Sequence, residues 1–274
     1  QSDGLIAALS AKLPDCHVES LDVQHAPTRL SDLLRKRFRP GDHLASPHLL
    51  IGAGHATHLG LLAARRRHGG KIIVLMKPSL PLSWFDCCVI PEHDEVPVSK
   101  HVMLTRGPLN AIQAQGEHAP DRGLILLGGP SAHAHWDSGA ICQQVEQVVR
   151  AQPQVDFQLS TSRRTPKELL PMLDQLVLPN LEIQLSTATP AGWVAQQLSA
   201  SSQAWISIDS ASMIYEALSA GVAVGILELQ RNLKSRVIRG LQRLQQEGLV
   251  TLFEQWRNQP SRLRPSPTPF NEAE

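Results

Sequence analysis

The sequence predicts an α/β protein of two Rossmann-like domains, each with a doubly wound parallel sheet. Three observations predict this class: apolar runs without polar alternation, helix-like segments between them, and glycines where several runs end. The 274 residues suffice for two domains of ordinary size, each with its own core.

The chain opens directly in a helix, because Leu5, Ile6 and Leu9 recur on one face of the segment after Ser2. An α/β domain seldom begins this way. We therefore expect a first strand and its loop to precede Gln1 in the natural protein.

Strands and helices then alternate. The predicted strands are short apolar runs at 48–52, 71–76, 87–91, 102–106, 123–129, 156–162, 181–187, 204–208 and 222–227. The further predicted helices combine apolar periodicity with glycine or proline at an end, and they cover 55–70, 139–152, 166–176 and 210–220.

The polar, aperiodic segment Gln113–Gly123 predicts a domain boundary. We place the first domain at 1–118 and the second at 119–256. The Pro-rich, polar tail at 257–274 predicts an extended or disordered segment that cannot bury a core.

Composition excludes several classes of function. With 26 basic and 25 acidic residues the formal charge is +1, and aromatics make up only 4%, so no nucleic-acid partner is expected. No apolar run approaches the roughly 18–20 residues of a membrane span. The first residues, QSDGLIAALSAKL, are neither basic nor apolar enough for a secretory signal, and the four cysteines form no CxxC pair. We therefore expect a cytoplasmic protein in which Cys87 and Cys88 are buried as small apolar side chains.

A first candidate site lies where the run at 123–129 ends. Gly128, Gly129, Pro130 and Ser131 stand between a strand and a helix, where backbone N–H groups can approach a phosphate. The spacing fits neither the Walker A nor the dinucleotide pattern. A strand-to-helix turn without a ligand is an equal alternative.

A second candidate follows the next strand, in the stretch Leu159–Pro166. Ser162, Arg163 and Arg164 come at its carboxyl end, where doubly wound sheets bind ligands and guanidinium groups can hold anionic oxygens. The alternative is a solvated pair of arginines on a loop.

A third candidate opens the helix at 210–220. Asp209 or Ser210 caps the helix, and the N–H groups near Ser212 and Met213 can face a phosphate. Glu216 is placed to accept hydrogen bonds from a ribose diol, with a surface glutamate as the alternative.

Catalytic candidates come from the first half. His93 and Asp94 could act as an acid/base pair, but the local sequence alone favours an ordinary acidic loop. His55 follows the first strand, three residues before His58, a spacing that can also join zinc ligands. No cysteine or carboxylate completes such a site, nor one at His133 and His135, so we expect no metal and no cofactor.

The ordered motifs GAGHATH, WFDCCVIPEHD, VMLTRGPLN, LLGGPSAHAHWD, TSRRTP and IDSASMIYEALSAGVAV resemble those of the mitochondrial-fission ELM (elongated mitochondria) family. The resemblance runs from Gln1 to about Trp256, and TSRRTP and DSASMIYEA are its most specific parts. One departure is the stretch Leu75–Pro81, where relatives show a QHPR-like element and Lys77 replaces the arginine as a point charge.

The resemblance implies a GT-B fold, with two Rossmann-like halves facing across a cleft, as in nucleotide-sugar glycosyltransferases. It implies that the loop at 128–131 and the helix start at 210–213 hold a nucleotide diphosphate. Glu216 would then bind ribose, with Arg163 and Arg164 opposite. The catalytic base would come from His55, His93 or Asp94, and the leaving diphosphate would need no metal.

The leading hypothesis is a glycosyltransferase that uses a nucleotide-diphosphate sugar and acts on an envelope glycan or glycolipid, with peripheral association at the inner membrane as an option. Two alternatives stay open. A nucleotide-sugar epimerase uses the same fold. Plant relatives are described as recruiting a fission dynamin, which implies a non-catalytic scaffold.

Overall fold

The structure is a computed structural model that describes residues 1–13, 15–23, 28–114, 116–233, 235–259, 263–266, 270 and 272. The chain divides into two compact units. The first comprises Gln1–Ala111 with Glu272–Glu274, and the second comprises Ile112–Asn271. Each unit carries its own parallel sheet, so the predicted α/β class with parallel sheets is confirmed.

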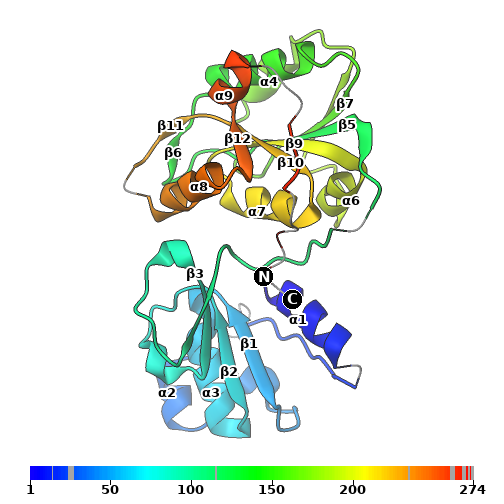
Figure 1. Ribbon diagram of the computed structural model, residues 1–274. Coiled ribbons are helices and arrows are strands. Elements are labelled where there is room, and N and C mark those ends of the chain that lie inside the picture. The colour runs from blue at the N-terminus through cyan, green and yellow to red at the C-terminus, as the bar shows by residue number, and fades with distance from the viewer. Residues whose placement is uncertain are drawn as a thin grey trace. The chain divides into compact units, whose positions relative to one another are not determined.

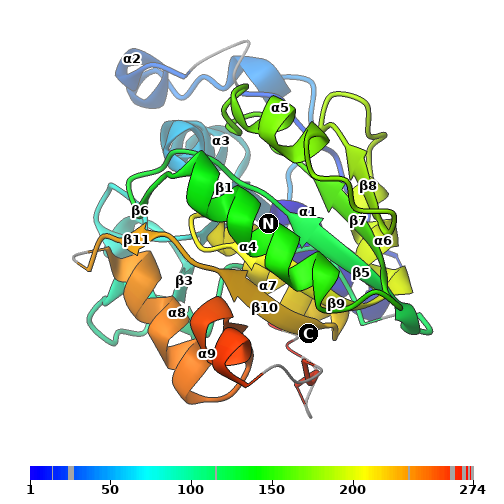
Figure 2. The same cartoon turned by 90° about the horizontal axis from the view of Figure 1, so that it is seen from above.

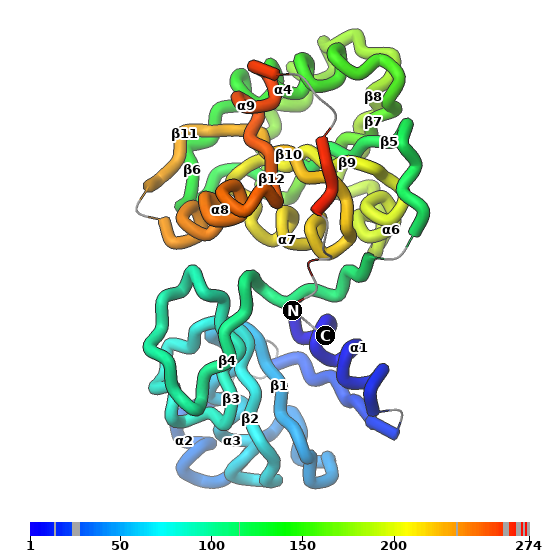
Figure 3. Tube along the Cα trace, in the orientation of Figure 1, coloured from blue at the N-terminus to red at the C-terminus, as the bar shows by residue number. Residues whose placement is uncertain are grey.

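The first unit holds a four-stranded parallel sheet in the order β1-β2-β3-β4 (Figure 3). Its strands, all predicted, are β1 (Leu49–Ala53), β2 (Lys71–Leu75), β3 (Cys87–Pro91) and β4 (Val102–Thr105). Its helices are α1 (Ser2–Lys12), α2 (Leu30–Leu34) and α3 (His58–His68).

Successive residues of this sheet pack on opposite faces, as extended backbone requires. Ile72 and Val74 of β2 lie in one apolar cluster with Leu61 and Leu62 of α3. Leu75 lies in another, with Leu5 of α1 packed against it. Cys88 is also buried, and burial together with the neighbouring Cys87 thiol raises its pKa to about 11.

The second unit holds a six-stranded sheet in the order β12-β10-β9-β5-β7-β8, with every pair parallel. Its strands are β5 (Ala119–Leu126), β7 (Asp156–Ser160), β8 (Leu181–Gln184), β9 (Ser201–Ser207), β10 (Ala223–Leu227) and β12 (Val250–Leu252). A short antiparallel pair, β6 (Ala134–His135) with β11 (Gln230–Arg231), lies outside it.

Helices cover both faces of this sheet, as a doubly wound fold requires. They are α4 (Ser138–Arg150), α5 (Leu169–Asp174), α6 (Trp193–Ala200), α7 (Ala211–Ala220), α8 (Arg236–Gln246) and α9 (Phe253–Asn258). Figure 1 shows α4 and α9 on one face and α6, α7 and α8 on the other. Figure 2 looks down on the first of these faces, with α4 in front of the strands.

The core of the second unit is built around Trp205 of β9, whose side chain is fully buried. Its ring meets those of Phe253 and Trp256 edge to face, with centroid distances of 6.4 and 5.1 Å. A Cβ on Gly225 of the adjacent strand would stand 2.4 Å from the Trp205 ring. The indole therefore requires glycine at that position.

Six elements in the described part of the second unit were not predicted: β6, α6, β11, α8, β12 and α9. The apolar residues of α8, among them Ile238, Leu241 and Leu244, are buried at helical spacing between arginines and glutamines. Among the described residues, no helix combines the length and the apolarity needed to cross a bilayer.

The two units divide ahead of the predicted boundary after residue 118. The reason lies in packing: Ile112 rests on the core of the second unit, and a Cβ on Gly116 would stand 2.5 Å from the carbonyl oxygen of Ser199. The polar composition of this segment does not reveal these contacts.

The prediction that the tail cannot bury a core is wrong at two described residues. Leu263 and Phe270 belong to the core of the second unit, and Phe270 packs on Tyr215 of α7 at a ring distance of 5.5 Å. The tail also begins inside α9, which ends at Asn258. Residues 260–262, 267–269, 271, 273 and 274 of the predicted tail lie outside the described residues.

Candidate functional site

The strand order of the second unit defines where a ligand is expected. In chain order its strands β5, β7, β8, β9, β10 and β12 take the sheet order 3-2-1-4-5-6 of the Rossmann fold. The order reverses between β5 and β9, and ligands of such sheets bind at the carboxyl ends of the strands at this switch point. The loop after β5 contains Gly128–Ser131, and the loop after β9 contains Asp209.

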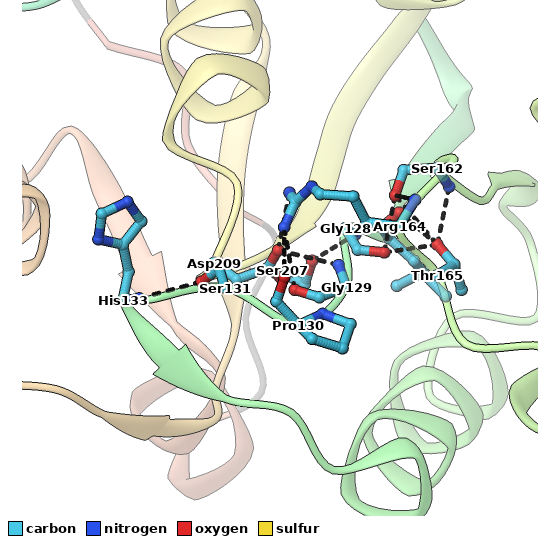
Figure 4. Close-up of polar contacts among 11 residues, drawn as sticks. Gly128, Gly129, Pro130, Ser131, His133, Ser162, Arg164, Thr165, Ser207 and Asp209 are labelled. Carbon is cyan, nitrogen blue, oxygen red and sulfur yellow. Dashed lines mark hydrogen bonds and ion pairs between the residues drawn. The ribbon is translucent and has the colours of Figure 1, made fainter.

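The two glycines after β5 form a turn whose N–H groups are bound by the β9 side. Gly128 N donates to Ser207 Oγ (2.8 Å), and Gly129 N donates to Asp209 Oδ2 (2.9 Å) (Figure 4). These N–H groups, predicted to face a phosphate, are therefore satisfied within the protein.

We call this segment, Gly128 and Gly129, the Gly-Gly turn. Neither position leaves room for a side chain. A Cβ on Gly128 would stand 2.1 Å from Asp209 Oδ2, and one on Gly129 would stand 2.1 Å from the carbonyl oxygen of Arg164. The close approach of three loops thus explains the glycine pair.

The loop after β7 covers the same turn from the other side. Ser162 Oγ donates to the Gly128 carbonyl (2.9 Å), and Thr165 Oγ1 donates to the Leu127 carbonyl (3.2 Å). Thr165 Oγ1 also accepts from Ser162 N (2.8 Å). The serine and threonine of the TSRRTP motif therefore hold the backbone of the Gly-Gly turn.

Arg164 completes this cover. Its Nη1 donates to the carbonyl oxygens of Gly129 and Pro130 (3.1 Å each), and its Nη2 donates to Asp209 Oδ2 (3.0 Å) (Figure 4). A planar guanidinium can serve a carboxylate and two carbonyls at once. Arg164 thus joins the loops after β5, β7 and β9.

Asp209 is the buried centre of this network. Its side chain is 0% exposed, whereas that of Arg164 is 45% exposed. Within the described part of the chain, Asp209 Oδ1 has no hydrogen-bond partner. A buried carboxylate with one unsatisfied oxygen is costly, so its pairing with a cation matters for the fold.

Arg163 lies in the same loop in a different environment. It is exposed, and among the described residues it has no recorded hydrogen bond or ion pair. The two arginines that the sequence pairs therefore differ: Arg164 is bound into the Gly-Gly turn, and Arg163 faces solvent.

Helix α7 begins directly after Asp209. Ser210 is its N-cap, and its side chain makes no capping hydrogen bond. Over the described residues, no acceptor is recorded for the N–H groups of Ala211, Ser212 and Met213. The first turn of α7 therefore presents backbone donors, with the partial positive charge of a helix N-terminus, at the switch point.

Glu216 lies further along α7 and is half-buried. Burial raises the pKa of its carboxyl, because desolvation disfavours the charged form. A carboxylate held in such surroundings is a strong acceptor for hydroxyl groups once it is ionised.

The rest of the loop after β5 is tied to the segment before α8. Ser131 Oγ accepts from His133 N (3.1 Å), and His133 Nδ1 lies 2.9 Å from Ser235 Oγ. From the sequence alone, we consider His133 only as half of a zinc pair with His135. His135 lies exposed on β6. A histidine in a glycine loop at a strand end was the signal that could have marked His133.

In the first unit, the predicted catalytic residues follow two strands of the parallel sheet. His55 lies exposed in a 3-10 turn after β1, and His93 and Asp94 lie in a 3-10 turn after β3. They share the carboxyl edge of that sheet. Lys77, from the loop after β2, donates to the backbone oxygen of Asp94 (3.2 Å).

A neighbouring histidine at this edge was not singled out as a catalytic candidate. His58 at the start of α3 is buried, with Nδ1 3.2 Å from Ser79 Oγ and its ring 5.6 Å from that of His55. Burial and the nearby His55 lower the pKa of His58, which favours the neutral imidazole. Across the described residues, no group of three or more His, Cys, Asp or Glu side chains could hold a metal ion.

Comparison with solved structures finds likenesses of fold. The chain superimposes on Staphylococcus aureus MnaA in complex with UDP at a TM-score of 0.52, with 13% identity over 91% of this chain and 79% of MnaA. A Listeria monocytogenes protein described as a UDP-N-acetylglucosamine 2-epimerase gives a TM-score of 0.52, with 13% identity over 75% of this chain and 62% of the Listeria chain. MurG of Acinetobacter baumannii gives a TM-score of 0.46, with 15% identity over 90% of this chain and 74% of MurG.

These likenesses assign a GT-B-type fold, the class of glycosyltransferases and sugar epimerases, and at such low identity they establish the fold alone. Comparison with curated protein sequences gives no significant match. The family model described as mitochondrial fission ELM1 matches residues 1–274. The chain therefore belongs to the mitochondrial fission ELM1 family.

Proposed function

We propose that the second unit binds the diphosphate of a nucleotide sugar at its switch point, and that the protein transfers the sugar to a glycan or glycolipid acceptor. The observation that carries the proposal is the uncapped first turn of α7, placed at the point where the strand order reverses. The fold shared with MnaA, which was solved with UDP, supports UDP as the first nucleotide to test.

Two layers of residues divide the work in this proposal. The inner layer holds the loops and consists of Gly128, Gly129, Pro130, Ser162, Arg164, Asp209 and Ser210. The outer layer faces the ligand. The N–H groups of Ala211, Ser212 and Met213 donate to the diphosphate, Ser131 and Arg163 add further donors, and Glu216 accepts from the ribose hydroxyls.

Transfer then requires three events. A base removes the proton from an acceptor hydroxyl, the resulting oxygen bonds to the anomeric carbon, and the bond from that carbon to the diphosphate oxygen breaks. We assign the base to the first unit, with His55, His93 and Asp94 as candidates. The donors of α7 and Arg163 stabilise the negative charge that develops on the diphosphate as it leaves.

Calorimetric titration with UDP, ADP and GDP tests the donor site. We expect one nucleotide to bind, and Arg163→Ala to weaken it about 10-fold, the usual effect of losing one charge-assisted hydrogen bond. Lys167→Ala is the control, because Lys167 is an exposed cation in the same stretch of chain. No binding of any nucleotide by the folded protein contradicts the proposal and favours a scaffold role.

A second measurement separates transfer from epimerisation. With a sugar nucleotide in deuterated water, a transferase incorporates no deuterium at the sugar C2, and it releases the nucleotide only when an acceptor is present. An epimerase exchanges the C2 hydrogen without an acceptor. Exchange of this kind would replace the transferase assignment and leave the donor site in place.

A further inference from the structure

We propose that Arg164 is a positioning residue that neutralises the buried charge of Asp209, so that the switch point can accept an anion while the Gly-Gly turn stays locked. The inference rests on the proposed function. It assigns the two adjacent arginines separate tasks: Arg164 offsets a charge of the protein, and Arg163 meets the charge of the ligand.

Asp209 is required by the turn itself. Its Oδ2 accepts the N–H of Gly129 (2.9 Å), and the carboxyl group occupies the space beside Gly128 where a Cβ would stand. An apolar residue at position 209 would leave the buried Gly129 N–H without a partner, at a cost of about 1–3 kcal/mol. The carboxylate therefore has a structural task that does not depend on any ligand.

The negative charge of the same carboxylate is unfavourable for binding an anion at the first turn of α7. Asp209 is the residue before the N-cap of α7, and its side chain is 0% exposed. Its Oδ1 has no hydrogen-bond partner in the described part of the protein, so its charge is not spread over further donors. An uncompensated buried carboxylate so close to the first turn of α7 would repel a diphosphate and oppose the donors there.

Arg164 both holds the Gly-Gly turn and offsets the charge of Asp209. Its Nη2 lies 3.0 Å from Asp209 Oδ2, and its Nη1 lies 3.1 Å from the carbonyl oxygens of Gly129 and Pro130. The pair has no net charge, and the guanidinium keeps two N–H groups, on Nε and Nη2, beyond these three bonds. The switch point thus retains the helix N-terminus and Arg163 as its net positive features.

The test is a double-mutant cycle with two readouts, the Kd for UDP and Tm. We expect Arg164→Met to weaken UDP binding about 100-fold, the scale of one charge repulsion at an effective dielectric constant of about 20. It should also lower Tm by roughly 5 °C, because Asp209 loses its cation. Adding Asp209→Asn should restore Kd to within about 10-fold of the wild type and recover most of Tm, since no charge is left to mask.

Two further variants sharpen the result. Lys167→Met removes one positive charge from an exposed position, and we expect it to change neither readout. Arg164→Lys keeps the charge without the fork, so UDP binding should stay within about 10-fold while Tm falls, because a lysine cannot serve the carboxylate and both carbonyls.

The cycle overturns the inference if the double variant is as impaired as Arg164→Met in both readouts, which is what a purely structural clamp predicts. Recovery of Tm without recovery of Kd overturns the link to the anion. If the wild type binds no UDP, the proposed function fails, and Tm still decides whether Arg164 masks Asp209.

Discussion

At the scale of single residues, the switch point is governed by how closely three loops approach. The carboxylate of Asp209 and the backbone of Arg164 occupy the space that side chains at Gly128 and Gly129 would need. Neither glycine has a positive φ, so the requirement is one of space rather than of backbone conformation.

Gly129→Ala therefore tests the approach directly. The new methyl would stand 2.1 Å from a backbone oxygen that cannot rotate away, and we expect a loss of about 2 kcal/mol in the free energy of unfolding. Urea denaturation measures this loss.

Gly139→Ala is the matched control. Gly139 is the second residue of α4, and a Cβ there would stand 3.4 Å from its nearest neighbour, Asp137 Oδ1. In a helix, alanine is favoured over glycine, so we expect a gain of about 0.5 kcal/mol. A loss at Gly139 as large as that at Gly129 would show that the effect is not specific to the turn.

At the scale of elements, α7 combines an exposed donor end with a half-buried acid. The pKa of Glu216 is raised in the folded state, so the contribution of this group to stability is fully present below the unfolded pKa of about 4.3 and is lost as pH rises through the folded pKa. At neutral pH the ionised, desolvated carboxylate therefore costs stability, as functional groups often do.

Glu216→Gln should accordingly raise Tm at pH 7, because the amide carries no charge to desolvate, and the difference should shrink as pH falls toward about 4. The same change should weaken UDP binding about 10-fold, because an amide accepts hydrogen bonds from ribose less strongly than a carboxylate. Thermal unfolding across pH and calorimetry measure the two effects. A variant that is no more stable at pH 7 and binds UDP normally would remove Glu216 from the site.

The elements also show what could be predicted from the sequence. Several strands, such as Lys71–Leu75 and Ala223–Leu227, are largely apolar runs, and these are visible without a structure because central parallel strands are buried on both faces. Helix α8 was missed although Ile238, Leu241 and Leu244 recur among arginines and glutamines at the spacing of an amphipathic helix, a pattern that the sequence alone shows. Packing of Leu263 and Phe270 was missed because it depends on partners far away in the chain.

The location of the candidate site was predictable from the sequence, but its hydrogen bonds and ion pairs were not. Motifs at the ends of β5, β7 and β9 point to one edge of a parallel sheet. No local pattern distinguishes Arg163 from Arg164, because the difference is a contact with Asp209, 45 residues further along the chain. For the same reason, the sequence could not reveal that Ser207 and Asp209 already bind the N–H groups of the Gly-Gly turn.

At the scale of the whole molecule, the chain is a member of the mitochondrial fission ELM1 family with a GT-B-type fold. The second unit provides the better-defined candidate site, with its hydrogen-bonded loops and the uncapped helix α7, and the first unit has histidines at the carboxyl edge of its own sheet. In the proposed function, donor binding belongs to the second unit and acceptor activation to the first.

The most direct measurement removes one backbone donor from α7. Ala211→Pro deletes the N–H of the first helical residue, a position that tolerates proline because its donor has no helical partner. Titration with UDP should show about 10-fold weaker binding than in the wild type and in the control Ala211→Gly, at unchanged Tm. Equal UDP affinity in all three proteins would contradict the central claim that the first turn of α7 holds the diphosphate.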